Sequence, residues 1–456
     1  MLLDRFGIEM RVAKPPDRKE LLHRIEAADL VRVLSADPDK RTNQEYLHWD
    51  KLRHLKPPQG LTSEEWWLQI KFARQAVMRS IPLTCPSGTR FFYTLPDVLL
   101  RLLHLVDQRC SGEIAMPEVV TADEQARRHY LVNSLMEEAI RSSQLEGATT
   151  SRRVAKELLR TGRDPKDRSE RMILNNYRAL QFMRDLGRQL TPPALLELHR
   201  ILTEGTLDNR DAAGRLQRPD EERIAVLDRV DGSVLHAPPP AEQLPARLEA
   251  LCAFANEEND ADTFVHPVVR AILLHFWLAY DHPFEDGNGR TARALFYWYM
   301  RTRGYWLVEY LTISNILRKA PGTYSRAYLM TENDEGDTTY FLLYQLEVIE
   351  RAIEDLHRYL ERKIAEIRSV ERLIKGAAGF NHRQLALLSD ALRHPDRTYT
   401  FGGHASIHQI THETARTDLS DLASRDLLLR RQAGRRYFFT VPGDIAERLE
   451  RLDLKG

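Results

Sequence analysis

The sequence predicts a mainly helical protein of several domains with two short β-hairpins. Apolar residues make up 43% of the 456 residues, which is enough for more than one hydrophobic core. Over long stretches they recur at every third or fourth position, as on one face of a helix. Strand-like patterns are confined to short segments at 223–236 and 398–441. A chain of this length has room for about three domains.

Charge and cysteine content exclude several classes of protein. Lys and Arg number 66, and so do Asp and Glu, which excludes a polycation that coats nucleic acid by bulk charge. The cysteines, Cys85, Cys110 and Cys252, lie far apart, which argues against a disulfide scaffold or a usual zinc site. The longest apolar uncharged run, 271–280, is too short for a membrane-spanning helix, which needs about 20 residues. We therefore expect a soluble, cytoplasmic protein.

Residues 1–112 form the first predicted domain, which is helical and to which the sequence assigns no role. Pro and Gly mark its turns, as at 57–60. Ser63 begins a predicted helix that carries Trp66 and Trp67. Aromatic side chains clustered in this way are typical of a core.

Residues 113–345 form the second predicted domain, which is built of helices. Its first helix spans 121–147, with Thr121 or Asp123 as the cap and Gly147 as the stop. Further helical patterns cover 167–186, 193–202, 241–256 and 264–280.

Three more segments complete the predicted organisation. The segment from Arg223 to His236 reads as a short hairpin with an Asp-Gly turn. Apolar residues keep a three-to-four spacing from 339 to 375, so 346–379 is predicted to be a connector helix that either packs or also forms a homodimer. Residues 380–456 form the last predicted domain.

The segment 282–293 carries the densest set of reactive side chains. It lies between two stretches that are apolar nearly all round, so we expect a rigid loop between two buried helices. Gly287 and Gly289 let backbone amides converge at the start of the second helix, which favours an anion there. Arg290 and Arg293 are cations at the unfavourable end of that helix dipole, and a bound anion would reverse the cost.

Two further residues of this segment suit phosphate chemistry. Asp286 is a hard oxygen ligand for the Mg²⁺ of a polyphosphate. His282 titrates near neutrality and can accept the proton of an attacking hydroxyl. The segment therefore predicts a phosphate-handling site.

This segment resembles the signature of Fic-domain proteins. The signature reads His-x-Phe-x-Asp/Glu-Gly-Asn-Gly-Arg-x-x-Arg, and the chain matches every specified position from His282 to Arg293. The resemblance extends over 120–345 and includes Leu198-His199-Arg200 and His266-Pro267. It implies a helical-bundle core with a short β-hairpin flap, and transfer of AMP from ATP to a hydroxyl of a target protein.

The resemblance also implies a role for individual residues. His282 would be the general base, Asp286 would hold Mg²⁺, and Phe284 would anchor the loop. The hairpin would align a segment of the target protein by strand addition. Tyr324, with Tyr328, either lines the adenine pocket or packs in the core. The remaining nucleotide-binding residues would be Gly287, Asn288, Gly289, Arg290 and Arg293.

A second misplaced charge lies at the end of the helix 121–147. Glu146 is in the last turn, where the helix dipole disfavours a carboxylate, and Ser142 is one turn earlier on the same face. Pairing Glu146 with an arginine of the loop would relieve both charges; the alternative is a solvated glutamate. The run Ser142-x-x-x-Glu146-Gly147 resembles the inhibitory motif of Fic proteins. It implies that Glu146 pairs with Arg293 and blocks productive docking of the γ-phosphate.

Residues 380–441 follow the order helix, strand, helix, turn, helix, hairpin, which resembles a winged helix-turn-helix. Nine Arg face six Asp and Glu over 381–441. The alternative is a fold used for protein contacts, and Asp418, Asp421 and Asp426 weaken the DNA interpretation. The candidate DNA-binding residues are Arg416, Arg430, Arg431, Arg435 and Arg436.

The leading hypothesis is an autoinhibited protein adenylyltransferase that uses ATP and Mg²⁺ to modify a target protein or itself. Three alternatives stay open: transfer of a phosphate or another nucleotide, removal of AMP, and a DNA-binding regulator whose core senses nucleotide. The intact glycine loop favours AMP transfer, because phosphate-transferring relatives depart from the signature there.

Overall fold

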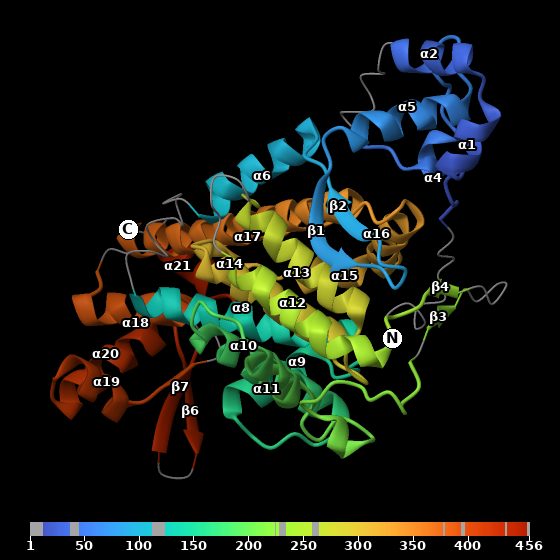
Figure 1. Ribbon diagram of the computed structural model, residues 1–456. Coiled ribbons are helices and arrows are strands. Elements are labelled where there is room, and N and C mark those ends of the chain that lie inside the picture. Colours follow the sequence, from blue (N-terminus) through green and yellow to red (C-terminus); the bar gives the residue numbers. More distant parts are fainter. Residues whose placement is uncertain are drawn as a thin grey trace. The chain divides into compact units, whose positions relative to one another are not determined.

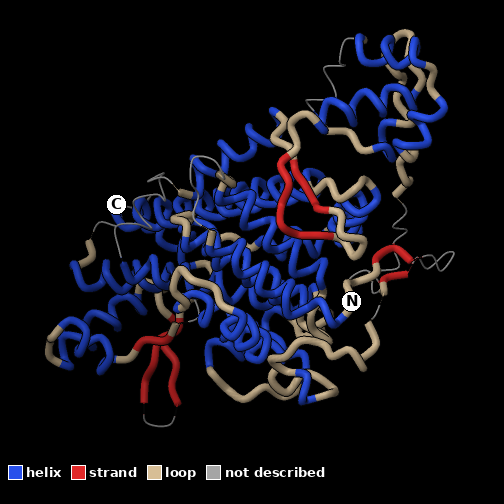
Figure 2. Tube along the Cα trace, in the orientation of Figure 1, coloured by secondary structure: helices blue, strands red, loops and turns tan. Residues whose placement is uncertain are grey.

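The computed structural model describes residues 12–36, 45–111, 124–223, 225–227, 234–257, 264–376, 379–393, 397–433 and 436–453. The chain divides into two compact units, Met1–Leu356 and His357–Gly456. Helices dominate both units, and the described strands form small antiparallel sheets (Figures 1 and 2). The mainly helical fold class predicted from the sequence is therefore confirmed.

Short helices and a hairpin form the N-terminal part of the first unit. Thr62 caps α5, since its hydroxyl accepts a 3.2 Å hydrogen bond from the Glu65 amide while the Glu65 carboxylate accepts one from the Thr62 amide. Trp66 and Trp67 are buried in the core of this part, as predicted. The elements are α1 (Arg18–Arg24), α2 (Ala27–Ser35), α4 (Trp49–Leu52), α5 (Ser63–Gln75), β1 (Arg79–Thr84), β2 (Arg90–Tyr93) and α6 (Asp97–Cys110).

The antiparallel hairpin β1–β2 was not predicted. Pro82 lies inside β1, and a proline has no amide to donate to a strand ladder, so the segment reads as turn-rich. The register of the pair shifts between Ser80 and Thr84, across this proline. Ile81 and Leu83, on either side of it, are buried. Tertiary burial therefore outweighs a weak local preference.

A bundle of helices follows. Helix α13 packs against α14 (Figure 1), and nearly every side chain of α13 is buried, as its uninterrupted apolar sequence predicted. The helices are α8 (Glu124–Leu145), α9 (Arg152–Thr161), α10 (Arg168–Asp185), α11 (Pro192–Thr203), α12 (Leu244–Asn256), α13 (Pro267–Asp281), α14 (Asn288–Thr302), α15 (Ile313–Lys319) and α16 (Pro321–Asn333). The predicted caps of α8, Thr121 and Asp123, lie outside the described residues, while Gly147 follows its end with a φ of 97°.

The predicted flap is a two-stranded antiparallel hairpin. Strand β3 (Val226–Leu227) pairs with β4 (Val234–His236), with Val226 opposite His236. The predicted Asp-Gly turn, at 231–232, lies outside the described residues.

Helix α17 (Thr339–Gly376) has 38 residues and begins where the long apolar periodicity begins. It covers nearly all of the predicted connector, 346–379, and its residues are shared between the two units. None of the described helices is long and apolar enough to cross a membrane.

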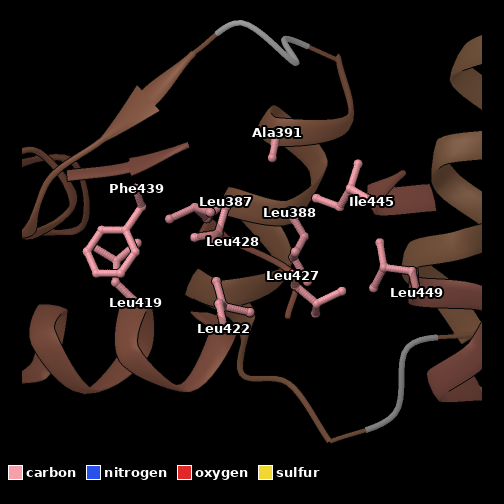
Figure 3. Packing of buried hydrophobic residues seen from close by; sticks show 10 residues of the cluster. All are labelled: Leu387, Leu388, Ala391, Leu419, Leu422, Leu427, Leu428, Phe439, Ile445 and Leu449. Atoms are coloured by element: carbon pink, nitrogen blue, oxygen red, sulfur yellow. The ribbon is translucent and has the colours of Figure 1, made fainter. Parts of the chain in front are cut away.

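The second unit has its own hydrophobic core (Figure 3). Its elements are α18 (His382–Arg393), β5 (Thr398–Tyr399), α19 (Phe401–His408), α20 (His412–Ser424), β6 (Leu429–Ala433), β7 (Arg436–Thr440) and α21 (Ile445–Asp453), with the strands in the order β5-β7-β6. Up to β7 this is the predicted order of elements, whereas α21 was not predicted. Ile445 and Leu449 of α21 join the core. The assignment to the winged-helix class stays a prediction.

Candidate active site

The loop between α13 and α14 is shaped by two residues with positive φ angles. His282 ends α13 with a φ of 45°, and Gly287 begins α14 with a φ of 87°. A Cβ atom on Gly287 would lie 2.9 Å from the Thr203 Cγ2 atom, so close packing as well as backbone conformation requires glycine here. The tight turn brings the start of α14 next to His282.

Asn288 fixes the conformation of this loop. Its Oδ1 accepts a 3.0 Å hydrogen bond from the Phe284 amide, and its Nδ2 donates a 2.8 Å bond to the Phe284 carbonyl. Phe284 is fully buried and stacks on the His199 ring at 3.8 Å between centroids, so it anchors the loop as expected.

The ring of His199, on α11, hydrogen-bonds to the loop between α13 and α14, a role that the sequence did not indicate. Its Nδ1 accepts a 3.0 Å hydrogen bond from the Gly214 amide. The proton of the neutral ring is therefore on Nε2, which donates a 2.9 Å hydrogen bond to the Asp286 carbonyl. Burial lowers the pKa of His199 to about 4, which keeps the ring neutral. The only signal in the sequence was its place in the segment Leu198-His199-Arg200.

His282 is held as a neutral imidazole beside the start of α14. The Asn288 Nδ2 atom lies 3.2 Å from both ring nitrogens. Burial lowers the pKa of His282 to about 3, and the neighbouring His236 and Arg223 act in the same direction. At neutral pH the ring can therefore accept a proton, as a general base must.

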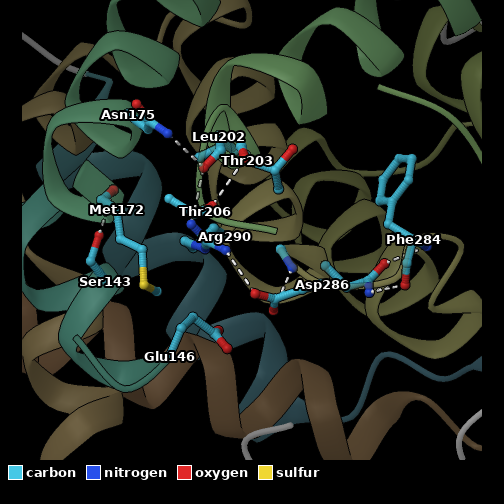
Figure 4. A network of polar contacts seen from close by, with 12 residues as sticks. Ser143, Glu146, Met172, Asn175, Leu202, Thr203, Thr206, Phe284, Asp286 and Arg290 are labelled. Carbon is cyan, nitrogen blue, oxygen red and sulfur yellow. Dashed lines mark hydrogen bonds and ion pairs between the residues drawn. The ribbon is translucent and has the colours of Figure 1, made fainter. Parts of the chain in front are cut away.

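Arg290 is fully buried under the loop. Its Nη1 donates to the Leu202 carbonyl at 3.1 Å, and its Nη2 lies 3.4 Å from Asp286 Oδ2 (Figure 4). The Arg290 Nε atom has no hydrogen-bond partner among the described residues. A buried cation that is only partly satisfied is suited to an anionic ligand.

Asp286 presents a partly exposed carboxylate at the mouth of the loop. Burial acts to raise its pKa, but Arg290 and the Gly287 amide outweigh burial and hold the pKa below its ordinary value. The described residues include no group of three or more potential metal ligands. A single carboxylate fits Mg²⁺ that a nucleotide brings with its phosphates, because Mg²⁺ is commonly held by one or two carboxylates plus substrate oxygens.

Arg293 joins α14 to α8. Its Nε donates to the Ser142 hydroxyl at 2.9 Å, and its Nη2 donates to the Ser142 carbonyl at 3.2 Å and to Glu146 Oε1 at 2.8 Å. The guanidinium is buried, and the Glu146 side chain is 10% exposed. Helix ends that each carry an unfavourable charge thus pair with one another, as the sequence led us to expect.

Glu146 lies directly over the start of α14. A Cβ atom on Gly289 would clash with Glu146 Oε1 and would lie 3.0 Å from the Arg293 Nη1 atom. Arg293 Nη1 has no hydrogen-bond partner among the described residues. The carboxylate therefore lies at the N-terminus of α14, where the helix dipole favours a negative charge.

Tyr324 lies in an aromatic cluster of the core. Its hydroxyl is 2.8 Å from His275 Nε2 and 3.1 Å from the Tyr328 hydroxyl, and its side chain is buried. These contacts account for Tyr324 and Tyr328 as packing residues. A role at the adenine stays a prediction.

The candidate DNA-binding residues belong to the second unit. Arg416 is exposed on α20, and Arg430 and Arg431 are exposed on β6. Arg436 begins β7, and Arg435 lies outside the described residues.

Comparison with known proteins identifies the helical core. Residues 189–300 match the sequence profile of the Fic/DOC family. A protein adenylyltransferase Fic of Nematostella vectensis is 42% identical over 60 residues, which are 13% of this chain and 14% of that protein. The protein of the same name from Culex quinquefasciatus is 31% identical over 119 residues, which are 26% of this chain and 22% of that protein. The chain thus matches less than a quarter of the length of these relatives.

A solved structure has a similar fold. The Fic family protein of Desulfovibrio desulfuricans G20 superposes with a TM-score of 0.53 at 17% identity, over 79% of this chain and 99% of that one. Residues 189–300 are therefore a Fic/DOC family domain within a Fic fold. Helix α8, which carries Ser142, precedes the matched residues, and so does Glu146, which follows directly after the helix.

Proposed function

We propose that this protein is an autoinhibited protein adenylyltransferase, which transfers AMP from ATP to a Ser, Thr or Tyr hydroxyl of a target protein. The observation that carries the proposal is the arrangement at the start of α14. A neutral His282 lies beside a helix N-terminus that is backed by two buried arginines, Arg290 and Arg293. This set of groups suits a reaction that is mainly positioning and charge stabilisation.

The reaction follows from the positions of these groups. The target hydroxyl attacks the α-phosphorus of ATP, a ring nitrogen of His282 takes the hydroxyl proton, and the bond between the α-phosphorus and the bridging oxygen breaks to release pyrophosphate. Backbone amides at the start of α14, with Arg290 and Arg293, stabilise the phosphate charge. Asp286 would hold Mg²⁺, which neutralises phosphate charge.

Glu146 inhibits by taking the place of a phosphate. Its carboxylate is 2.8 Å from Arg293 Nη2 and covers Gly289, so a nucleotide that reached Arg293 would place like charges together. Removing the carboxylate while keeping the loop intact is expected to activate the enzyme.

The test compares the wild-type chain, Glu146→Gly, and Glu146→Gly with His282→Ala. With ATP labelled at the α-phosphate, Glu146→Gly should label itself or lysate proteins more strongly than wild type, and the second substitution should lower labelling by about 10²- to 10⁴-fold. Glu137→Gly is the matched control, because Glu137 is on the helix that precedes Glu146 but pairs with Arg152 and Lys156. Equal labelling of Glu146→Gly and Glu137→Gly would contradict autoinhibition.

Further measurements separate the alternative functions. Intact-mass spectrometry distinguishes an added AMP group from an added phosphate, and label from the γ-phosphate would indicate phosphate transfer. Loss of AMP from a previously modified protein would indicate AMP removal. No added group on any protein would favour a nucleotide sensor.

A second candidate function, binding of DNA by the second unit, is favoured by the way its charges pair. Asp418 is buried against Arg383 at 2.8 Å, and Asp421 pairs with Arg425 at 3.1 Å. Two of the three acidic residues that counted against DNA binding in the sequence, Asp418 and Asp421, thus pair with arginines of the same unit.

The remaining cations define the test of this second function. Arg416, Arg430 and Arg431 pair with no carboxylate among the described residues, whereas Arg397 pairs with Asp390. If the unit binds duplex DNA, Arg430→Ala with Arg431→Ala should reduce the slope of log affinity against log salt by about 1 to 2, and Arg397→Ala should change it less. The absence of a salt-dependent mobility shift would favour protein contacts instead.

A further inference from the structure

Two side chains tie the base of the hairpin β3–β4 to the catalytic loop. Arg223, just before β3, donates from Nη1 to the His282 carbonyl at 2.9 Å and from Nη2 to the Asp281 carbonyl at 2.7 Å. At the other end, His236 closes β4. Its Nε2 lies 3.0 Å from the Tyr280 carbonyl, and its Nδ1 lies 2.8 Å from Glu332 Oε2 on α16.

The His236 contacts require a charged ring. A carbonyl and an ionised carboxylate are both acceptors, whereas a neutral imidazole has a single N–H. His236 can therefore satisfy Tyr280 and Glu332 together only as an imidazolium. The His236 side chain is 11% exposed and that of Glu332 is 18% exposed, so water replaces a lost bond only in part.

The surrounding charges act in both directions. Burial lowers the pKa of His236, and so does Arg223, but Glu332 and the Tyr280 carbonyl outweigh them and raise it above its ordinary value. Of the other titratable groups near the ring, His282 is neutral and the Tyr280 phenol packs edge-on against it, at 5.0 Å between centroids. Glu332 is therefore the group whose charge holds the imidazolium.

We propose that His236 is a positioning residue for AMP transfer, which ties the target-aligning hairpin to α16 and to the end of α13 that carries His282. The inference rests on the proposed transferase function, and it adds a requirement that the family signature does not contain. When His236 is neutral, either Tyr280 or Glu332 loses its donor. The base of the hairpin then loosens, while His282 itself stays in place through its own bonds to Asn288.

The pH dependence has a definite sign. The pKa of His236 is raised in the folded chain. Both hydrogen bonds of its ring are therefore made at lower pH, and one of them is lost as the pH rises through the pKa of the folded state. His282 titrates near 3 and adds no change in the neutral range. A decline of AMP transfer as the pH rises above 6.5, the ordinary pKa of an imidazole, is thus expected to follow His236.

The first arm of the test does not depend on AMP transfer. Amide hydrogen exchange of β4 is measured across pH in the full-length wild type, His236→Gln and Glu332→Gln. Both variants should exchange about two- to tenfold faster than wild type near pH 6.5, where His236 is still charged in wild type, with the difference shrinking as the pH rises further. Glu335→Gln is the control, because Glu335 pairs with Lys71 instead. A difference that is absent, or the same at every pH, would overturn the proposal.

The second arm measures self-modification in the Glu146→Gly background. Glu332→Gln should move the decline in AMP transfer to lower pH, and His236→Gln should lower the rate and remove that decline. Unchanged pH profiles would overturn the role in transfer even if exchange is altered. If Glu146→Gly itself transfers no AMP, the proposed function fails, and the exchange arm alone then shows whether His236 ties the hairpin.

Discussion

Two buried ionic networks in the first unit differ in how completely they are satisfied. The first joins α5 to the segment between α16 and α17. Lys71 Nζ lies 2.7 Å from Asp334 Oδ1, and Arg74 donates to the Tyr340 hydroxyl and the Leu47 carbonyl. Arg74 also lies 4.0 Å from Asp337. We call these residues, together with Tyr46, whose hydroxyl donates to Asp337, the junction network: Tyr46, Lys71, Arg74, Asp334, Asp337 and Tyr340.

The second network surrounds the start of α14. Arg290 and Arg293 are as deeply buried as Lys71 and Arg74, but each keeps one nitrogen without a hydrogen-bond partner among the described residues. The carboxylate that pairs with Arg293 is that of Glu146, directly after α8 and outside the loop. We call the set of Asp286, Arg290, Arg293 and Glu146 the motif network.

This difference in hydrogen bonding separates a network that stabilises the fold from one with donors left for a ligand. Native proteins leave few buried polar atoms unsatisfied, so the saturated network is explained by folding alone, while the incomplete network keeps donors that a ligand could use. The junction network fixes the N-terminal helices on the Fic core. In the motif network, Glu146 supplies the carboxylate that pairs with Arg293, and under the proposed function it does so where a phosphate would bind.

The largest effect on stability is expected in the junction network. Asp334→Asn leaves Lys71 and Arg74 short of a buried countercharge and should lower the free energy of unfolding by about 3–5 kcal/mol. Urea denaturation followed by tryptophan fluorescence measures it, because Trp66 and Trp67 lie in the adjoining core.

The matched control for this variant is Glu335→Gln. Its side chain is 46% exposed and also pairs with Lys71, so its loss should cost less than about 1 kcal/mol. If both substitutions lowered the free energy of unfolding equally, burial would not explain the difference expected between the Lys71–Asp334 and Lys71–Glu335 pairs.

A smaller, ligand-dependent effect is expected in the motif network. Glu146→Gly leaves Arg293 with Ser142 as its partner and should destabilise the ligand-free chain by about 1–3 kcal/mol. Mg-ATP at about 100 times its dissociation constant should restore about 2.7 kcal/mol. Thermal unfolding with and without Mg-ATP measures both.

The comparison of variants decides whether the motif network is a ligand site. Mg-ATP should stabilise Glu146→Gly more than wild type, because in this variant the nucleotide no longer competes with the Glu146 carboxylate. It should not recover what Asp334→Asn loses. The same gain for wild type and Glu146→Gly would show that Glu146 does not compete with the nucleotide.

The smallest effect is a pH dependence at Asp286. Its pKa lies below the ordinary value of 3.8, so the ionised carboxylate contributes stability above that pH and loses the contribution as the pH falls through the folded value. Asp286→Asn should therefore be less stable than wild type by under about 1 kcal/mol near neutrality, because the carboxylate is partly exposed. Urea denaturation from pH 7 downward should show the gap closing below 3.8; a constant gap would contradict this assignment.

Local patterns predicted much of the candidate site. The buried helices α13 and α14, the loop between them and the end of α8 all follow from apolar periodicity, glycine and caps, which act over a few residues. Helix ends with unfavourable charges also indicated the pairing of Glu146 with Arg293, because electrostatics at a helix terminus can be read from sequence. The hairpin β1–β2 could not be read in this way, since its proline obscures a strand that burial stabilises.

The sequence by itself therefore determined the helical class, the loop chemistry and the charges that need a partner. Only the tertiary structure decided which partners they find. Lys71 meets Asp334 across 263 positions of sequence, and His236 meets Glu332 across 96. Such contacts depend on the path of the whole chain rather than on neighbouring residues. For the same reason the sequence assigned no contact to the rings of His199 and His236. Only the packing of the chain fixed which group each ring nitrogen faces.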